Sequence, residues 1–312
     1  MAARVQAFRI EEAVGRKVSS TRGKGVDGSK SPGLNVVQYP IDTGLPDINF
    51  RFGFDQIGDG FFTPRHRHNF DQFRYVVSGQ MNLGKGVELQ EGELVHVPEG
   101  TYYGPLNQHG PVSLLVIQFP GPNGAYRISD AEKAVAMEQL RAAGGYFEDG
   151  AYKVKQADGH SVNKDSYEAV WEQVNGKPIS YSKPRYETPI IMRPQAFRWI
   201  ADPNRPGVEV KQLGVFNEYR TGVALWRIAP GAVIPAEVLE SPELRCVIRG
   251  ETAYEGKVIN EKGCYYIPEG VATQPITSPK GAELLVYTLP MYAKAMWEKA
   301  KERRAALETV AA

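Results

Sequence analysis

Hydrophobic and β-branched residues recur in short runs along this chain, and Gly, Pro and Asn separate the runs. Between residues 36 and 120 the runs are VVQYPI, INFRFGF, FRYVVSG, ELVHVP and VSLLVIQF. From residue 190 onward they are VALWRIA, LRCVIRG, GCYYIP and AELLVYTL. Many short strands separated by turn residues are typical of antiparallel barrels and sandwiches. The pattern therefore predicts an all-β protein made of two barrels.

A helical period interrupts this pattern between the barrels and returns at the end. Residues 129–143 predict a helix in which Ser129 caps the first turn and Gly144 ends the last. A second helix is predicted from about residue 164 to residue 174, within a polar stretch. The tail from 291 to 312 predicts an amphipathic helix that packs against a barrel or a partner subunit.

These elements divide the 312 residues into five predicted parts. A chain of this length suits two domains and can bury a large core without disulfide bonds. The first part is rich in Gly, Ser and basic residues, which favours a loop or flexible arm. The parts are an N-terminal arm (1–35), an N-terminal barrel (36–122), a partly helical linker insert (123–189), a C-terminal barrel (190–290) and a C-terminal helix (291–312).

The two predicted barrels share a sequence frame. LRCVIRGETAYEGKV (244–258) aligns with FRYVVSGQMNLGKGV (73–87), and YYIPEG (265–270) aligns with VHVPEG (95–100). Both copies keep an Arg, a β-branched pair, a turn Gly and a Pro-Glu-Gly turn at nearly constant offset. Such self-similarity indicates a duplicated fold unit.

Charge and cysteine content exclude several classes of function. Lys and Arg number 37 against 36 Asp and Glu, so we expect neither a nucleic-acid nor a membrane partner. The chain has no apolar run long enough to span a bilayer and no secretory pattern at its start, so a cytoplasmic location is expected. Cys246 and Cys264 fall on strands that can be neighbours, and buried reduced thiols are expected there rather than a disulfide.

The segment PRHRHNFDQFRYVVSG (64–79) carries the strongest chemical signal. Residues two apart on a strand point to the same face, so His66 and His68 can reach one ion together. Gln72 can join them from the start of the next strand. A hydrogen-bonded polar pair of histidines inside a barrel is the structural alternative.

Together with GELVHVPEGTYYGP (92–105), this segment resembles the paired motifs of the cupin superfamily. Those motifs are a His-x-His with a Glu three or four residues later, and a Gly-x5-Pro-x-Gly-x2-His. The resemblance implies a bicupin of two double-stranded β-helix (jelly-roll) barrels, with a divalent metal on His66, His68, Gln72 and Tyr103. Gln72 stands at the Glu position and Tyr103 at the last His position, which makes the metal site degenerate.

The second copy departs further from the pattern at its ligand positions. Leu239 stands where His68 does, and a Leu side chain cannot bind a metal. No cupin-type ion is therefore expected in the second barrel. The remaining equivalences place Glu237 at the position of His66, Glu243 at that of Gln72 and Thr273 at that of Tyr103.

Arg74 shares a strand face with Gln72, so it is expected to point into the first barrel. A buried guanidinium needs an internal acid or an anionic guest. Arg245 is its equivalent in the second barrel, where the acids at positions 237 and 243 can pair with it.

In the first barrel the residues at the matching positions carry no negative charge. Arg74 is thus a candidate for holding a carboxylate or enolate of a substrate, and pairing with Asp55 or Asp71 is the alternative.

Three functions remain open from sequence. The first is a metal-dependent enzyme, most readily an Fe(II) dioxygenase, with Mn, Ni or Zn as other metals; its small aromatic or carbonyl substrate would contact Arg74, Phe52 and Tyr102. The second is an isomerase or lyase that uses Tyr103 as a general acid or base without a redox metal. The third is a binding protein without catalysis. The resemblance and the terminal helix also predict a homodimer.

Overall fold

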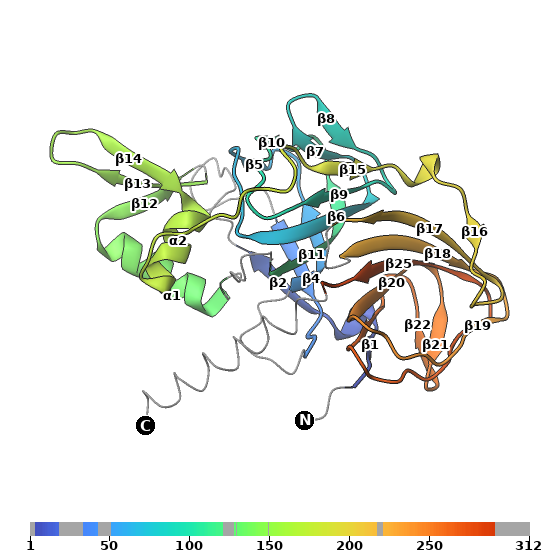
Figure 1. Ribbon diagram of the computed structural model, residues 1–312. Coiled ribbons are helices and arrows are strands. Elements are labelled where there is room, and N and C mark those ends of the chain that lie inside the picture. Colours follow the sequence, from blue (N-terminus) through green and yellow to red (C-terminus); the bar gives the residue numbers. More distant parts are fainter. Residues whose placement is uncertain are drawn as a thin grey trace, which may run out of the picture. The chain divides into compact units, whose positions relative to one another are not determined.

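The computed structural model describes seven stretches of the chain (Figure 1). The predicted C-terminal helix over 291–312 lies outside them, as does the predicted cap Ser129. Two compact units contain the described residues. We name them the first-barrel unit (15–18, 34–38 and 51–192) and the second-barrel unit (4–14, 39–42 and 193–290). The described stretches are 4–18, 34–42, 51–120, 128, 130–148, 150–216 and 221–290.

The first-barrel unit contains a seven-stranded antiparallel sheet with the order β15-β9-β6-β11-β4-β3-β2. Two small sheets, β10-β5 and β7-β8, accompany it. The expected antiparallel β-barrel is confirmed. In chain order the strands are β2 (Val14–Val18), β3 (Leu34–Gln38), β4 (Arg51–Ile57), β5 (Phe62–Thr63), β6 (Phe70–Ser78), β7 (Met81–Gly84), β8 (Val87–Leu89), β9 (Leu94–Val97), β10 (Leu106–Asn107), β11 (Val112–Pro120) and β15 (Ile190–Met192).

Strand register decides which side chains face the interior of this barrel. Residues directly opposite each other on antiparallel strands share a face of the sheet. Arg74 lies opposite Val95 on β9 and Val116 on β11, and both valines belong to the buried apolar core. Gln72 lies two residues before Arg74 on β6, so both side chains face the interior, as predicted.

The second-barrel unit repeats this arrangement. Its large sheet has the order β1-β23-β20-β25-β18-β17-β16, and a second sheet has the order β19-β24-β21-β22. The elements are β1 (Gln6–Phe8), the 3-10 helix η1 (Ile10–Glu12), η2 (Pro194–Ala196), β16 (Ile200–Ala201), β17 (Val208–Val215), β18 (Gly222–Ile228), β19 (Ala232–Ile234), β20 (Glu243–Gly250), β21 (Thr252–Tyr254), β22 (Lys257–Ile259), β23 (Cys264–Ile267), β24 (Ile276–Ser278) and β25 (Ala282–Thr288).

Backbone hydrogen bonds confirm the predicted residue-by-residue equivalence of the two barrels. The Gly100 amide donates to the His68 carbonyl at 2.8 Å, and the Gly270 amide donates to the Leu239 carbonyl at 2.9 Å. In the same way Tyr103 N donates to His66 O at 3.0 Å, and Thr273 N donates to Glu237 O at 2.9 Å. The two ligand positions of each copy therefore occupy the same places in the two barrels.

Each large sheet is completed by a strand distant in sequence. β1 pairs with β23, so residues 6–8 of the predicted arm belong to the second-barrel unit. β15 pairs with β9, so residues 190–192, at the predicted start of the C-terminal barrel, belong to the first-barrel unit. Edge strands as short as these have too few residues for the alternation of apolar and polar side chains to show which sheet they join.

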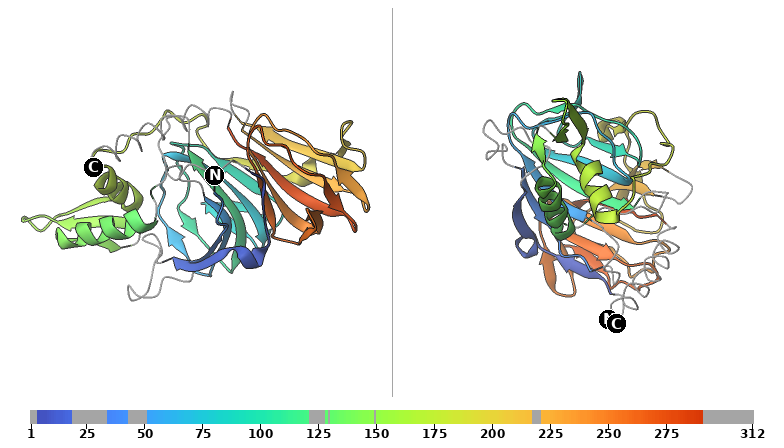
Figure 2. Two further views of the ribbon diagram at one scale, coloured as in Figure 1. Left: turned by 90° about the horizontal axis from the view of Figure 1, so that it is seen from below. Right: turned by 90° about the vertical axis from the view of Figure 1, so that its left-hand side faces the viewer.

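The insert folds as two helices and a three-stranded sheet, coloured green in Figures 1 and 2. Both predicted helices are present. Asp165 caps the second by accepting from the backbone N–H groups of Tyr167 and Glu168, and Gly176 ends it with a φ of 62°. The sheet was not predicted, because its strands are polar and partly exposed. The elements are α1 (Asp130–Ala142), β12 (Gly145–Glu148), β13 (Ala151–Lys155), β14 (Ser161–Asp165) and α2 (Ser166–Asn175).

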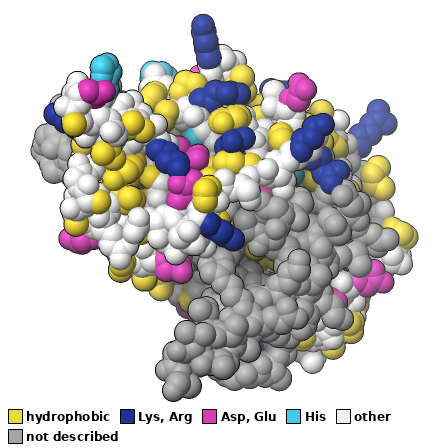
Figure 3. Space-filling view, turned by 60° about the vertical axis from the view of Figure 1, so that its left-hand side comes forward, with side chains coloured by type: hydrophobic (Ala, Val, Ile, Leu, Met, Phe, Trp, Pro, Cys, Tyr) yellow, Lys and Arg dark blue, Asp and Glu magenta, His cyan; other side chains and the backbone are white. Residues whose placement is uncertain are grey.

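The two cysteines lie directly opposite each other on β20 and β23, and both are free and fully buried, as predicted. Burial raises the pKa of both thiols, which keeps them protonated and unreactive. Figure 3 shows Lys and Arg side chains dispersed among hydrophobic, acidic and other side chains on one face of the molecule. Among the described residues, no helix is both long and apolar enough to cross a membrane.

Candidate functional site

His66 and Tyr103 form the base of the candidate site. An isolated antiparallel bridge joins them, with His66 N donating to Tyr103 O and Tyr103 N donating to His66 O, each at 3.0 Å. Their side chains therefore share a face, and the Tyr103 hydroxyl lies 2.8 Å from His66 Nε2. Both side chains are buried. The predicted convergence of these two residues is present.

The proton on His66 is assigned from its hydrogen bonds. His66 Nδ1 lies 2.6 Å from the carbonyl oxygen of Pro64, which can only accept. Nδ1 therefore carries the proton, and Nε2 presents a lone pair to the barrel interior. A backbone carbonyl that fixes the outer nitrogen of an imidazole is the usual support for a metal-binding histidine.

His68 lies beside this pair. Its Nδ1 is 3.3 Å from Gln72 Nε2 and 3.5 Å from the Tyr103 oxygen. The rings of His66 and His68 are 5.0 Å apart between centroids. Because the Gln72 amide nitrogen can only donate, His68 Nδ1 accepts and also presents a lone pair at this point.

Gln72 is oriented by Arg74. Arg74 Nε donates to Gln72 Oε1 at 3.2 Å, so the amide oxygen faces the guanidinium and the amide nitrogen faces His68. The sequence predicts Gln72 as a metal ligand, a role that needs its amide oxygen because the amide nitrogen has no lone pair to give. In this orientation Gln72 supports His68, and it could act as a ligand only after releasing Arg74.

Arg74 also donates from Nη2 to the Tyr103 hydroxyl at 2.8 Å and lies over the ring at 5.2 Å. Among the described residues it forms no ion pair. The two acids considered as partners bond elsewhere: Asp55 pairs with Arg51, and Asp71 accepts from the Glu99 amide at 2.6 Å. Arg74 thus lies beside the two histidines with a charge that no described carboxylate neutralises.

Two of the distances between the donor atoms are close to those between ligands of one divalent ion. Neighbouring ligands 2.0–2.1 Å from a tetrahedral or octahedral ion are about 2.8 to 3.4 Å from one another. The Tyr103 oxygen is 2.8 Å from His66 Nε2 and 3.5 Å from His68 Nδ1, which are close to the two ends of this range. No cluster of three or more His, Cys, Asp or Glu side chains suited to a metal occurs in the described part of the chain. The side chains best placed to bind a divalent ion are therefore those of His66, His68 and Tyr103, and Gln72 lies beside them.

Phe52 and Tyr102, two expected substrate contacts, lie away from this group. Phe52 is opposite Ile117, which is opposite Phe73, so these three side chains occupy the face of the sheet that Arg74 does not. Tyr102 is 39% exposed and carries the Arg65 guanidinium over its ring, because its side chain points opposite to that of the adjacent Tyr103. Alternation within one strand predicted Arg74 correctly, but register between strands could not be read from the sequence.

Three aromatic contacts near His68 were missed. Its ring stacks on Phe70 with centroids 4.4 Å apart, and Tyr167 of α2 approaches the His68 ring edge-on at 5.4 Å. Tyr167 also approaches Phe70 edge-on at 5.7 Å. Phe70 follows His68 by two residues on an apparent strand, which is a usable signal. No sequence signal connects Tyr167 to this site across about a hundred residues.

In the second barrel, charged side chains fill the equivalent position. Arg245 is fully buried and donates to Glu237 at 2.6 Å and to Glu243 at 2.8 Å, as predicted. Glu237 also accepts from Arg205 at 2.6 Å. Burial alone would raise the pKa of Glu237, but Arg245 and Arg205 outweigh it and hold that pKa below its ordinary value. Both acids that replace metal-site donors are therefore bound to arginines.

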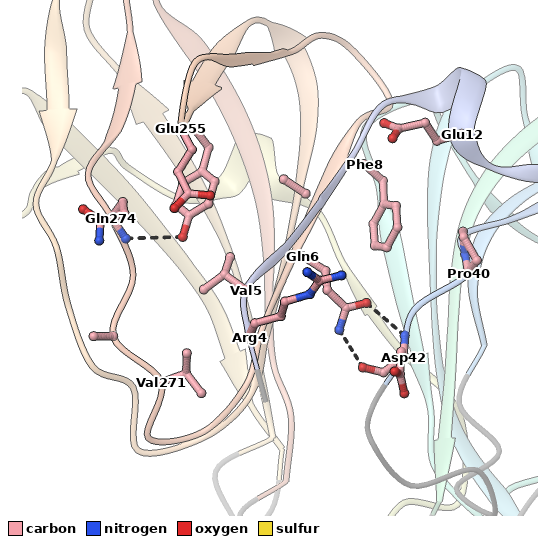
Figure 4. A pocket seen from close by; sticks show the side chains of 13 residues that line it. Arg4, Val5, Gln6, Phe8, Glu12, Pro40, Asp42, Glu255, Val271 and Gln274 are labelled. Atoms are coloured by element: carbon pink, nitrogen blue, oxygen red, sulfur yellow. Dashed lines mark hydrogen bonds between the residues drawn. The ribbon is translucent and has the colours of Figure 1, made fainter. Parts of the chain in front are cut away.

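A separate cavity of about 610 Å³ lies beside β1 in the second-barrel unit (Figure 4). Two of its lining residues bond to each other: Gln6 Nε2 donates to the Asp42 carbonyl, and the Asp42 amide donates to Gln6 Oε1 at 2.9 Å. Its other polar lining residues include Arg4, Glu12 and Glu255. This mixture brings together no histidine and no set of convergent donors, so the candidate site remains in the first barrel.

Sequence comparison places a known domain over the candidate site. Residues 56–118 match the family model described as a cupin domain. This span contains both histidines, Gln72, Arg74 and Tyr103. No curated protein matches the sequence.

Solved structures match along nearly the whole chain. A candidate dioxygenase from Nostoc punctiforme shares 12% identity with a TM-score of 0.62, and the match covers 92% of this chain and 83% of that one. Streptomyces albus HEPD, solved with 2-hydroxyethylphosphonate and Fe(II), shares 11% identity with a TM-score of 0.54 over 92% and 76% of the two chains. Bacillus subtilis oxalate decarboxylase, described for its Mn(II) centres, shares 14% identity with a TM-score of 0.51 over 92% and 78%. At these identities the likeness establishes the fold.

Proposed function

We propose that this two-barrel protein, which carries a cupin domain over residues 56–118, is a metal-dependent oxygenase with one active site, in the first barrel. The observation that carries this proposal is the convergence of three lone-pair donors beside an arginine that no described carboxylate neutralises. The donors are His66 Nε2, His68 Nδ1 and the Tyr103 oxygen. The neighbouring structures support a divalent metal, since one is described with Fe(II) and another with Mn(II).

The roles of the residues follow from their chemistry. His66, His68 and Tyr103 would hold the ion, and Fe(II) there would supply the redox chemistry of an oxygenase. Arg74 binds an anionic oxygen of the substrate through its forked N–H donors. We propose a small substrate with an aromatic ring or a carbonyl and an acidic group, because the site combines this guanidinium with the aromatic rings of Phe70 and Tyr103.

Oxygen uptake tests this function directly. Protein purified without chelators is loaded anaerobically with Fe(II), Mn(II) or Zn(II), and a panel of aromatic and 2-oxo acids is added with dissolved oxygen. We expect uptake with Fe(II) and at least one acid, and none with the His66→Ala protein treated in the same way. Turnover of an acid without oxygen uptake would contradict an oxygenase and leave a metal-dependent lyase.

Gln72→Glu is expected to tighten metal binding roughly tenfold, because it places an anionic oxygen where the amide nitrogen now faces His68. Isothermal titration with Mn(II) measures the change. Gln118→Glu is the matched control: Gln118 lies opposite Gln72 on the same face, so it adds the same charge one strand away. An equal gain in both variants would show a general effect of charge, and no gain in Gln72→Glu would contradict a ligand position at residue 72.

Arg74→Lys is expected to weaken binding of a small carboxylate, and Arg74→Ala to weaken it by about 2 to 5 kcal/mol where the pair is desolvated. Lysine keeps the charge but loses the forked donors that now reach Gln72 and Tyr103. Titration with oxalate as the probe, on metal-loaded protein, measures this effect. Both variants should keep their metal. If Arg74→Ala binds oxalate as tightly as the wild type, Arg74 is not the anion site.

A metal-independent isomerase or lyase is the second candidate, and one observation favours it. The hydrogen bonds from Arg74 to Tyr103, from Tyr103 to His66, and from His66 to Pro64 form a complete chain without an ion. Tyr103 could then move a proton as a general acid or base. A metal-independent enzyme would keep its turnover after exhaustive chelation and lose it in Tyr103→Phe. The metal-dependent oxygenase would lose its turnover after chelation and also in Tyr103→Phe.

A further inference from the structure

Tyr167 connects the insert to the candidate site. It is the second residue of α2 and lies 98 positions after Asn69, yet its hydroxyl donates to Asn69 Oδ1 at 2.8 Å. Its ring meets His68 at 5.4 Å and Phe70 at 5.7 Å, with interplanar angles of 76° and 85°. Edge-to-face contacts at these distances are the favoured geometry of aromatic pairs.

The insert holds Tyr167 firmly at this place. Asp165 caps α2 by accepting from the Tyr167 amide at 2.9 Å, and the Ser166 amide donates to the Gly150 carbonyl at 3.0 Å. The Tyr167 ring packs against the small core of the insert, which includes Val170 and Trp171. Because the insert fixes the half-buried Tyr167 side chain, Tyr167 can orient the barrel side chains that it contacts.

The two histidines of the site are held by different means. His66 is fixed through Nδ1 by the Pro64 carbonyl. The His68 ring stacks on Phe70 at 4.4 Å and meets Tyr167 in a T-shaped contact at 5.4 Å, and because Phe70 and Tyr167 are 5.7 Å apart, the three rings all contact one another. These two aromatic contacts of His68 support the orientation in which its Nδ1 faces Gln72 and Tyr103.

Asn69 depends on the same tyrosine. Its side chain is fully buried, and its Nδ2 has no hydrogen-bond partner among the described residues. The Tyr167 hydroxyl satisfies the oxygen of this amide. Without the Tyr167 hydroxyl, the oxygen of the Asn69 amide would also be buried without a hydrogen-bond partner. Burying an unpaired polar atom is costly, and Asn69 is next to His68 in sequence.

We propose that Tyr167 is a positioning residue of the first-barrel site: its ring packs against both the His68 imidazole and the Phe70 ring that stacks on it, and its hydroxyl holds Asn69. The insert is therefore part of the site and not only a connection between the barrels. The consequence for metal binding rests on the proposed function, whereas the consequence for the orientation of His68 does not.

Three substitutions test this inference. Tyr167→Ala removes the ring and the hydroxyl, Tyr167→Phe removes only the hydroxyl, and Tyr146→Ala is the matched control on the exposed side of the same insert. Crystal structures of the metal-free proteins report the distance from Gln72 Nε2 to His68 Nδ1, which is 3.3 Å in the native arrangement. Titration with Mn(II) reports affinity. If Tyr167→Ala does not fold, Tyr167→Leu replaces it in both measurements.

In Tyr167→Ala we expect the His68 ring to leave Gln72 while His66 keeps its contact with Tyr103, and Mn(II) affinity to fall on the order of tenfold. Tyr167→Phe should keep the His68 ring in its wild-type orientation and retain most of the Mn(II) affinity. Tyr146→Ala should match the wild type in both measurements. His68 unmoved in both Tyr167→Ala and Tyr167→Leu would overturn the proposal. If wild-type protein binds no Mn(II), the proposed function fails separately, and the metal-free structures still decide the role of Tyr167.

Discussion

Replacing His66 or His68 with Ala is expected to remove bound metal and activity while leaving the fold nearly intact. Each substitution deletes one of three converging donors, so we expect metal affinity to fall on the order of 100-fold or more. The barrel does not need the ion for stability, because its apolar core is extensive and buried. Elemental analysis of dialysed protein measures the metal, and circular dichroism checks the fold.

His109→Ala is the control for this experiment. His109 belongs to the same barrel, but it is exposed in the turn before β11 and contacts Asn107 rather than the site. It should retain the wild-type metal content. Equal metal loss in His109→Ala would indicate nonspecific surface binding, and full metal retention in His66→Ala would show that the site is not built around these donors.

Glu237→Gln is expected to destabilise the protein by about 3 kcal/mol at neutral pH. Glu237 is the acid that Arg245 and Arg205 share, and Arg245 is fully buried. Removing its charge leaves buried guanidinium groups with fewer partners. Urea unfolding followed by tryptophan fluorescence measures the loss. Glu209→Gln, which breaks an exposed pair with Arg227, should change stability by about 0.5 kcal/mol or less.

The effect of Glu237 should depend on pH in one direction. Its pKa in the folded protein lies below the ordinary value of 4.5, so its ionised form stabilises the fold. This stabilisation is fully present above about pH 4.5 and is lost as pH falls through the lowered folded-state pKa. The difference in stability between wild type and Glu237→Gln should therefore shrink below pH 4.5. A difference that stays constant from pH 7 to pH 3 would show that the charge of Glu237 is not what stabilises the barrel.

Local patterns predicted much of the fold and part of the site. The repeated frame identified two barrels and placed Arg245 beside Glu237 and Glu243, because duplicated units keep equivalent positions. Alternation along a single strand placed Gln72 and Arg74 on one face. The first inference depends only on comparing two copies of one motif, and the second depends only on residues that are close together in sequence.

Contacts that depend on distant segments could not be predicted. The face of Phe52 is set by the register of β4 against β11, and the orientation of the Gln72 amide is set by Arg74. Tyr167 lies on α2 of the insert, and it contacts His68 and Asn69 from a segment about a hundred residues away in sequence. The polar strands β13 and β14 lack a clear period, since both of their faces are partly exposed.

Anomalous X-ray scattering at the iron edge, on crystals grown from Fe(II)-loaded protein, tests the central claim most directly. We predict one anomalous peak per chain, between His66 Nε2, His68 Nδ1 and the Tyr103 oxygen, and none between Glu237 and Thr273 in the second barrel. No peak in the first barrel, or a peak at the second-barrel position, would contradict a single metal site built on His66 and His68.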